Sequence, residues 1–370
     1  MNDKNCMMGT ACIFTNGKLD RPDAKTAHGL IRGTERFDII GVVDHCHAGK
    51  DAGECLDGRQ RDIPVHKSVS DLIKKTGKRP DFGIIGVAIS GGRLDAAWQE
   101  LILDAMGHGL SIINGMHMLL NEIPKFQRAA RANGVELIDI RKPKSFDQLK
   151  AWTGEIYSVA APRIAFLGSD CALGKRTTAR MVEKLCCRAG IKAEMIYTGQ
   201  TGWLQGYTYG FIFDATLNDF VSAEVENAIV QCSRNTVPDL ILIEGQSALR
   251  NPLGPCGAEI VVSGNVKGVI LQHAPFRKYY DDLDHVGCLL PDLESEIRLV
   301  EMYGTSVLAV TLNGEGGSSE QLTDYAVQTQ DQTGIPMVRP IEEGVDRLLP
   351  IVEKYIAGHE DLSDVTRIDR

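Results

Sequence analysis

A glycine-bounded loop that contains a lysine is the strongest candidate for chemistry in this sequence. It reads GSDCALGKRTT over residues 168–178, follows the apolar run at 163–167 and precedes helical periodicity at 179–185. In a strand–loop–helix of this kind, backbone amides and the helix N-terminus face an anion that the lysine neutralises. We therefore predict a site for a nucleotide or another phosphate-rich cofactor, with a plain glycine-rich turn as the alternative. The predicted cofactor-binding residues are Gly168, Ser169, Asp170, Cys171, Gly174, Lys175, Arg176, Thr177 and Thr178.

The loop departs in two ways from the common phosphate-binding pattern. Five residues separate Gly168 from Gly174, one more than usual, and Arg176 occupies the position of the serine or threonine that binds Mg²⁺. The longer spacing, with an aspartate two residues after the first glycine, resembles the loop of dethiobiotin synthetase and its relatives. Thr177 or Thr178 can offer a hydroxyl from an unusual position, and Arg176 adds a cation that suits a ligand with several phosphates. Phosphate binding is therefore predicted, and nucleotide hydrolysis stays open.

An apolar strand that ends in an acidic residue supplies a second candidate group. Residues 239–244 read DLILIE, and in a parallel sheet the final Glu244 emerges at the edge where such sheets build their sites. If Mg²⁺ is bound, Asp170 and Glu244 are its expected ligands, and without a metal Glu244 can act as a general base. A capping or salt-bridging glutamate is the alternative.

Ionisable groups also gather in a loop of the first half. Residues 43–54 leave a predicted strand and contain Asp44, His45 and His47, which can form an acid–base set because histidine titrates near neutrality. A metal at the two histidines lacks a third ligand nearby in sequence, and a solvated loop without chemistry is the other alternative. The predicted catalytic residues are Asp44, His45, His47 and Glu244.

Other strand ends carry groups that can hold a substrate. The glycine-rich turn at 86–93 can cradle a carboxylate or phosphate with Arg93 beside it, and Arg277 can clamp an anionic ligand. The glycines at 198–202 permit close approach of a ligand, or form a tight turn. His117 can either contact a substrate or be a buried histidine that is hydrogen-bonded to the backbone. The predicted substrate-binding residues are Arg93, His117, Gln200, Gln246 and Arg277.

Short apolar runs alternate with helical stretches along both halves of the chain. In the first half we predict strands at 37–43, 81–88, 110–113 and 135–140, and helices at 70–76, 94–106 and 123–133. In the second half we predict strands at 164–167, 193–197, 240–244, 266–272 and 307–312, helices at 177–189, 223–234, 293–303, 319–328 and 345–357, and a frayed tail from residue 358. Nearly continuous apolar strands between helices indicate parallel sheets covered on both faces.

These elements predict an α/β fold with two domains. Residues 1–155 form an N-terminal Rossmann-like parallel-sheet domain, and residues 156–370 form a C-terminal P-loop NTPase-like parallel-sheet domain. The boundary is placed in residues 143–162, which have a proline at each end and no long apolar run. The first domain lacks a G-x-G-x-x-G fingerprint, so NAD is not inferred.

Composition restricts the partners and the compartment. The 370 residues are 43% apolar and carry a net charge of −9, which argues against a sequence-independent nucleic-acid surface. No apolar stretch approaches the roughly 18–20 residues of a membrane span, and the first ten residues lack a signal-peptide core. We therefore expect a cytoplasmic protein without a membrane partner. The ten cysteines form no C-x-x-C pair, so we expect reduced, mostly packed thiols and no structural metal. Cys171 lies in a loop whose amides and cations favour a thiolate, so it is either a packed residue or a reactive one.

Taken together, several segments resemble a family long known only as a domain of unknown function. They are residues 47–54, 86–94, 113–120, 168–179, 198–202, 244–249 and 273–277. Members of that family pair an N-terminal Rossmann-like domain with a C-terminal P-loop domain, and some are assigned as D-glutamate N-acetyltransferases. The resemblance runs from about residue 40 to near the C-terminus, and the ordered motifs are specific for the family rather than for one substrate.

The resemblance implies an acyltransferase that moves an acetyl group from acetyl-CoA to the amine of D-glutamate, a catabolic step before oxidation. Lys175, Arg176 and the loop amides would then hold the phosphates of coenzyme A without Mg²⁺. The substrate would be a small amino acid, and we expect a homo-oligomer. Two alternatives stay open: an enzyme of the dethiobiotin synthetase-like class, a ligase or kinase using ATP and Mg²⁺, and a nucleotide sensor without turnover. The acceptor, its chirality and the choice of general base also stay open.

Overall fold

The computed structural model divides the chain into two compact units, and each is described by itself. The N-terminal unit contains Met1–Lys144 together with Gln200–Thr208, and the C-terminal unit contains Ser145–Gly199 together with Tyr209–Arg370. The structure describes residues 8–88 and 94–368, with the helix backbone alone at 360–368. No helix within these residues is long and apolar enough to span a bilayer.

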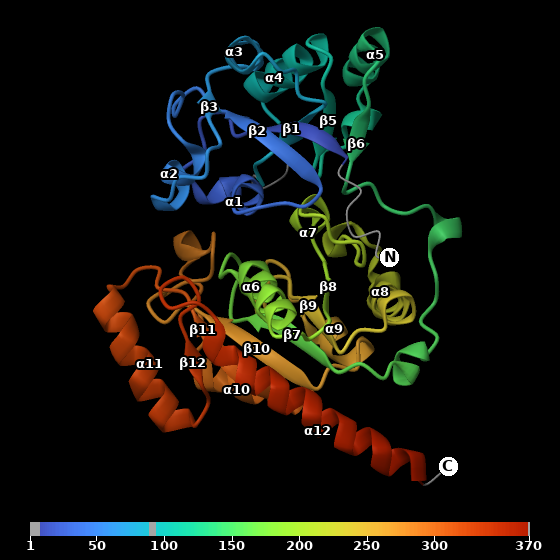
Figure 1. Ribbon diagram of the computed structural model, residues 1–370, viewed down its shortest axis with the longest axis vertical. Helices are drawn as coiled ribbons and strands as arrows, with labels where there is room; N and C mark the ends of the chain where they lie inside the picture. Colours follow the sequence, from blue (N-terminus) through green and yellow to red (C-terminus); the bar gives the residue numbers. More distant parts are fainter. Residues whose placement is uncertain (1–7, 89–93, 369–370) are drawn as a thin grey trace. The chain divides into compact units, whose positions relative to one another are not determined.

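A six-stranded parallel sheet forms the centre of the N-terminal unit (Figure 1). Its strands are β1 (Gly9–Phe14), β2 (Phe37–Val43), β3 (Val65–His66), β4 (Phe82–Ile85), β5 (Ser111–Asn114) and β6 (Leu137–Asp139), in the spatial order β3-β2-β1-β4-β5-β6. Its helices are α1 (Lys25–Ile31), α2 (Ala52–Asp57), α3 (Val69–Thr76), α4 (Ala96–Gly107), α5 (Pro124–Asn133) and α7 (Gln200–Leu204). The order reverses between β1 and β4, which confirms the Rossmann-like prediction. The sequence analysis missed β1, β3, α1, α2 and α7.

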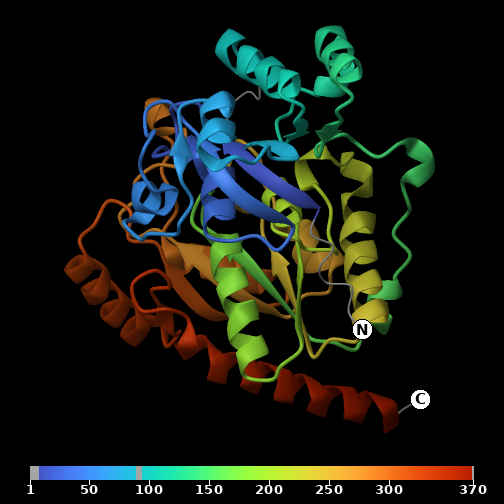
Figure 2. The same ribbon diagram turned by 45° about the horizontal axis from the view of Figure 1, so that its top comes forward.

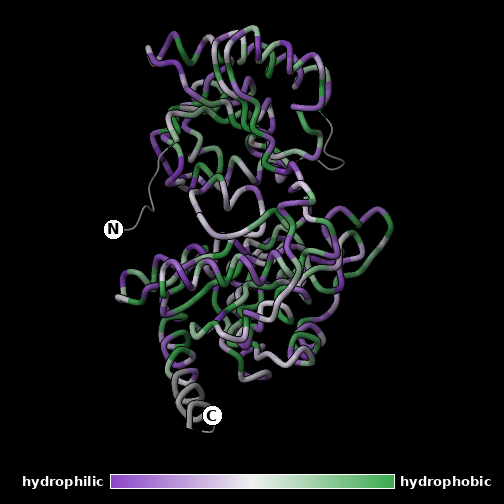
Figure 3. The backbone as a smooth tube through the Cα atoms, turned by 90° about the vertical axis from the view of Figure 1, so that its right-hand side faces the viewer, coloured by the Kyte–Doolittle hydropathy of each residue, from purple (hydrophilic) through white to green (hydrophobic). Residues whose placement is uncertain are grey.

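The strands of this sheet send side chains alternately to two cores. In β1, Cys12 and Phe14 pack with residues of α3, α4 and α5, whereas Ala11 and Ile13 pack with residues of α1, α2 and α7. Because both faces are covered, the strands contain continuous apolar runs rather than alternating polar positions. The hydropathy colouring of Figure 3 shows these apolar runs in the interior of each unit.

The C-terminal unit is built around a second six-stranded parallel sheet. Its strands are β7 (Arg163–Gly168), β8 (Ala193–Ile196), β9 (Leu240–Glu244), β10 (Gly268–His273), β11 (Ser306–Leu312) and β12 (Met337–Val338), in the order β12-β11-β10-β7-β9-β8. Its helices are α6 (Lys175–Arg188), α8 (Val221–Thr236), α9 (Ala258–Ser263), α10 (Leu293–Met302), α11 (Ser319–Thr333) and α12 (Leu349–Ile368). Figure 2 shows α6 in front of the sheet and α12 against α6. The predicted P-loop NTPase-like fold is confirmed, although β12 and α9 were not predicted. The C-terminal tail was expected to fray, but it continues helix α12 to Ile368.

Residues 145–155, which the sequence analysis assigned to the first domain, pack on the C-terminal unit. Glu226 on α8 accepts hydrogen bonds from the backbone amides of Thr153 (2.6 Å) and Ile156 (3.2 Å). Ile156 is fully buried in the core of that unit. A buried carboxylate therefore fixes the connecting segment, and the division falls after Lys144.

Residues 200–208 interrupt the C-terminal unit in sequence but pack on the N-terminal unit. Leu204 is fully buried in the core beside α1, and the Gln205 side chain donates to the carbonyl of Gly29 at 2.8 Å. The guanidinium of Arg36 stacks on the ring of Trp203 at 4.4 Å. The chain therefore passes between the units three times, which a single predicted boundary did not anticipate.

Candidate functional site

The phosphate-binding loop leaves the middle of the C-terminal sheet, where β7 lies between β10 and β9. Gly174 precedes the first turn of α6 with a φ of 98°, a left-handed conformation that glycine adopts without strain. A Cβ atom on Gly168 would stand 3.3 Å from the Lys175 ammonium, so the glycine lets that side chain lie along the backbone. The strand, loop and helix expected from the sequence are all present.

Asp170 holds this loop together. Its side chain is fully buried, and one carboxylate oxygen accepts bonds from the Cys171 amide (2.6 Å) and the Asn251 side chain (2.9 Å). The other accepts from the guanidinium of Arg277 (2.9 Å) and the backbone amide of Asp281 (2.8 Å). Four donors thus occupy the carboxylate that the sequence analysis considered as a Mg²⁺ ligand.

Arg277 is engaged in the same network. Besides Asp170, its guanidinium donates to the carbonyl of Cys171 at 2.8 Å and pairs with Glu315. Its side chain is 9% exposed. The residue predicted to clamp an anionic substrate is thus bound to three protein acceptors and braces the loop.

Lys175 lies buried beneath the loop. Its ammonium donates to the carbonyl oxygens of Asp170 (2.6 Å) and Ser247 (2.8 Å). Burial lowers the pKa of Lys175, because the charged form loses hydration, while the nearby thiol of Cys171 and the Asp170 carboxylate act in the opposite direction. Ser247 presents its carbonyl from a left-handed conformation with a φ of 38°, in the segment that follows β9.

Arg176 and Glu244 form an ion pair next to the lysine. The guanidinium lies 3.5 Å from one oxygen of Glu244, and the other oxygen accepts from the backbone amide of Thr198 at 3.2 Å. Burial raises the pKa of Glu244, and Arg176 offsets part of that rise. Gln246 donates to the hydroxyl of Thr198 at 3.0 Å, which places this predicted substrate-binding residue beside the pair.

Two further residues of the loop contact β10. The Thr178 hydroxyl donates to the Gln272 side chain at 3.0 Å, so it is turned into the sheet. The Ser169 hydroxyl lies 2.9 Å from Nδ1 of His273. Burial lowers the pKa of His273 to about 4, which keeps this ring neutral at pH 7. Both contacts anchor the loop to the strand beside it.

The other predicted catalytic residues lie in the N-terminal unit, where β2 ends. Asp44 is fully buried, and one oxygen accepts from Thr15 Oγ1 at 2.6 Å and the Gly17 amide at 2.8 Å. Its other oxygen lies 2.9 Å from Nδ1 of His47. Burial raises the pKa of Asp44, but the bonds from Thr15 and His47 outweigh this effect, and the pKa lies below its usual value. An ionised carboxylate thus orients His47, and Asp44 itself is a poor base.

The remaining predicted residues of this unit are dispersed along the sheet edge. His45 is exposed, and its ring lies over Gly17, where a Cβ atom would stand 2.9 Å away. His117 is exposed after β5, so the buried alternative is wrong. Gln200 is 7% exposed and accepts a bond from Arg141 at 2.9 Å. Arg93 lies outside the described residues.

The sequence analysis missed several residues that build the loop's surroundings. They are Ser247, Asn251, Gln272, Asp281 and Glu315. The proline- and glycine-rich stretch at 250–257 signals a turn, but no local pattern shows that the side chain of Asn251 reaches back to Asp170.

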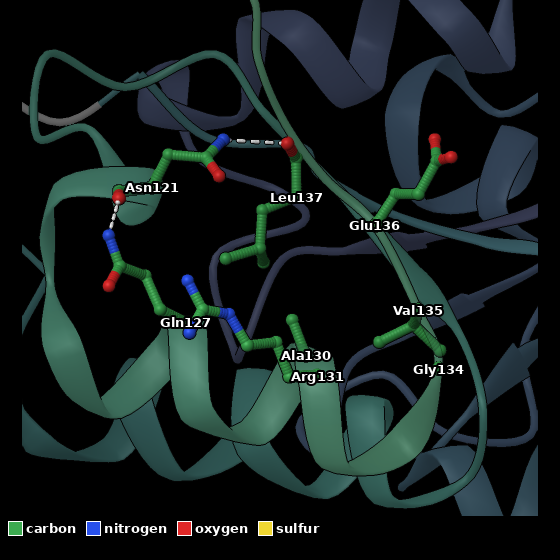
Figure 4. Close-up of a pocket in the computed structure, with 8 residues that line it drawn as sticks. All are labelled: Asn121, Gln127, Ala130, Arg131, Gly134, Val135, Glu136 and Leu137. Carbon is green, nitrogen blue, oxygen red and sulfur yellow. Dashed lines mark hydrogen bonds between the residues drawn. The ribbon is translucent and has the colours of Figure 1, made fainter.

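A surface pocket of about 440 Å³ lies elsewhere in the N-terminal unit (Figure 4). It is lined by Asn121, Gln127, Ala130, Arg131, Gly134, Val135, Glu136 and Leu137. Asn121 donates to the carbonyl of Leu137 at 2.6 Å, and Glu136 points away from the hollow in Figure 4. None of the predicted site residues lines this pocket, so the candidate chemistry is not located there.

Among the residues that the structure describes, no group of three histidine, cysteine, aspartate or glutamate side chains is placed to hold a metal ion. Three of the side chains considered for Mg²⁺ already have other partners. Asp170 accepts from four donors, Thr178 donates to Gln272, and Glu244 faces a guanidinium. These residues do not fit the Mg²⁺ site that a P-loop fold implies.

Comparison with known proteins agrees with this two-part architecture. Residues 150–349 match the P-loop domain of a family of unknown function, DUF1611, and residues 45–143 match its Rossmann-like N-terminal domain. A crystal structure of a DUF1611 family protein from Anabaena variabilis is similar, with a TM-score of 0.84 and 25% identity over 94% of this chain and 99% of that chain.

Two curated relatives have assigned names. A protein of Pseudoalteromonas named D-glutamate N-acetyltransferase is 27% identical over 273 residues, which cover 72% of this chain and 79% of the relative. A protein of the same name from Tritonibacter scottomollicae is 27% identical over 274 residues, with the same coverage.

Proposed function

This chain belongs to the DUF1611 family, and from that premise we propose that it is an N-acetyltransferase that moves an acetyl group from acetyl-CoA to the amine of D-glutamate. The names of the two curated relatives support an N-acetyltransferase acting on D-glutamate. The use of acetyl-CoA is supported by the phosphate-binding loop of the C-terminal unit. This loop contains two cations, Lys175 and Arg176, and the carboxylates near them already have hydrogen-bond or ion-pair partners.

Coenzyme A suits this loop because its phosphates need cations and amides but no hydrolysis. Its pyrophosphate and 3′-phosphate are multiply charged, and a helix N-terminus with a lysine and an arginine is a standard site for such anions. A γ-phosphate transfer would need Mg²⁺ held by a hydroxyl and a carboxylate. Arg176 stands at the hydroxyl position and binds the carboxylate of Glu244. The loop therefore supports holding phosphates more than transferring them.

The reaction requires removal of two protons from the nitrogen and stabilisation of one oxyanion. The ammonium of the amino acid loses one proton to a base, and its nitrogen attacks the thioester carbonyl. The tetrahedral oxyanion then collapses to expel the thiolate of coenzyme A, which takes up the second proton that the nitrogen loses. Among the predicted bases His47 fits best, since Asp44 fixes its ring through Nδ1 at 2.9 Å, while Nε2 faces the exposed carboxylate of Asp20 at 3.5 Å. The side chain of His47 is 12% exposed.

Thiol release from acetyl-CoA in the presence of D-glutamate tests the proposal. We expect release with D-glutamate and none with L-glutamate, in EDTA and without ATP, and we expect Lys175→Met to abolish it. The exposed Lys184→Met on the same helix is the matched control. ADP formation from ATP and Mg²⁺ with an amino acid, without thiol release, would place the protein in the ligase or kinase class instead.

A further inference from the structure

The position after the P-loop lysine is where phosphate-binding proteins usually place the hydroxyl that holds Mg²⁺. In this protein that position carries Arg176, whose side chain is 21% exposed and turned toward β9. Glu244, at the end of β9, is the residue expected to face the metal from the other side, and its side chain is 4% exposed. A guanidinium thus lies 3.5 Å from the carboxylate that a metal would use.

We propose that the guanidinium of Arg176, held by Glu244, takes the place of Mg²⁺, so that the site binds cofactor phosphates without a metal and discriminates against Mg²⁺-nucleotides. The inference deepens the proposed function and rests on it for the identity of the cofactor, coenzyme A.

Charge and geometry both support this assignment. A guanidinium supplies several N–H donors in a fixed plane, so it can bind the carboxylate with one edge and a phosphate with another. A divalent cation beside it would be repelled by the guanidinium and would compete for the same carboxylate oxygens. The second oxygen of Glu244 accepts from the amide of Thr198, and Gln246 donates to the hydroxyl of Thr198. This bonding holds the carboxylate toward Arg176.

Two alternative metal ligands of the loop, Thr178 and Asp170, are also unsuited. The Thr178 hydroxyl is 3.0 Å from Gln272 and turned into the sheet. Asp170 is saturated by four donors, one of them the charged Arg277. Mg²⁺ prefers oxygen ligands with ideal octahedral geometry. Binding of Mg²⁺ at this site would require breaking either the Arg176–Glu244 ion pair or the hydrogen-bond network of Asp170 that shapes the loop.

Isothermal titration calorimetry with coenzyme A and with ADP, each in Mg²⁺ and in EDTA, tests the proposal. Wild-type protein should bind coenzyme A equally in both buffers, and Mg²⁺ should not tighten the binding of ADP. Arg176→Thr restores the usual hydroxyl. We expect this variant to bind coenzyme A in EDTA at least about tenfold more weakly than wild type, and to bind ADP more tightly when Mg²⁺ is present. Arg176→Lys should keep the metal independence of wild type, and Arg188→Thr at the exposed end of α6 is the control.

The outcomes separate this inference from the proposed function. Binding of coenzyme A by wild type only when Mg²⁺ is present would overturn the inference and leave acetyl transfer standing. Metal-independent binding of ADP without binding of coenzyme A would support the inference and overturn the proposed cofactor. The role of Arg176 would also be refuted if the Arg176→Thr variant bound coenzyme A as tightly as wild type and its affinity for ADP were the same with and without Mg²⁺.

Discussion

Replacing Asp170 with asparagine should lower the free energy of unfolding of the C-terminal unit, because it removes the charge at the centre of the loop network. The carboxylate is fully buried and pairs with the guanidinium of Arg277, which is 9% exposed. Removing one partner of a buried pair costs about 3–5 kcal/mol, since the other charge is left uncompensated. Glu315 also pairs with Arg277 from an exposed position, so we expect the lower end, about 3 kcal/mol. For a unit of this size that lowers Tm by roughly 6–12 °C.

Differential scanning calorimetry measures this change, with Asp331→Asn on the exposed side of α11 as the control. Arg277→Met removes the other partner, and the double variant should cost less than the sum of the single variants by about 1–3 kcal/mol. Additive effects, or an Asp170→Asn protein that melts within about 2 °C of wild type, would refute the buried-pair argument. A Tm that Mg²⁺ raises in wild type but not in Asp170→Asn would instead make Asp170 a metal ligand.

Three further predictions concern the ends of other strands. The depressed pKa of Asp44 contributes stability that is present above its unfolded pKa, about 4, and is lost as pH falls through its lower folded pKa. Asp44→Asn should therefore flatten the acid side of the stability profile measured by urea unfolding between about pH 5 and pH 2, and an unchanged slope would contradict this. His47→Gln should lower kcat/KM for acetyl transfer about 10²–10⁴-fold, whereas a variant with the kcat/KM of wild type would exclude His47 as the base. Gly245→Ala should destabilise the protein by about 1–3 kcal/mol, because its Cβ would stand 2.2 Å from the Phe166 carbonyl, while Gly254→Ala, with open space around it, should be neutral in the same thermal scan.

Local patterns were sufficient to predict both folds and the phosphate-binding loop. The strand at Leu240–Glu244 is observed with its predicted limits, because a continuous apolar run bounded by polar residues specifies a buried parallel strand. The central strand Gly9–Phe14 was missed, since its six residues include glycine, alanine and threonine and follow a polar start. Its place in the sheet depends on pairing with β2 and β4, residues far along the chain.

Partners across the fold could not be predicted from spacing. Asp170 and Arg277 are 107 residues apart, and only the adjacency of β7 and β10 brings their loops together. The sequence analysis could identify both as charged residues at strand ends, but not that each satisfies the other. The same reason explains the transfer of residues 200–208 to the N-terminal unit, because Leu204 and Gln205 find their partners on α1 and the loop after it.

Two aspartates that the structure describes as fully buried, Asp44 and Asp170, have the same structural role, one in each unit. Asp44 follows β2 and Asp170 follows β7, and each binds backbone amides of the surrounding loops together with a side chain of opposite or titratable charge. A carboxylate whose oxygens already accept several hydrogen bonds has few lone pairs left for a metal ion. Under the proposed function, the groups that take part in the reaction are those that these carboxylates hold in place, His47 in one unit and the cations of the phosphate-binding loop in the other. In each unit, the aspartate at the strand end then contributes by positioning other residues.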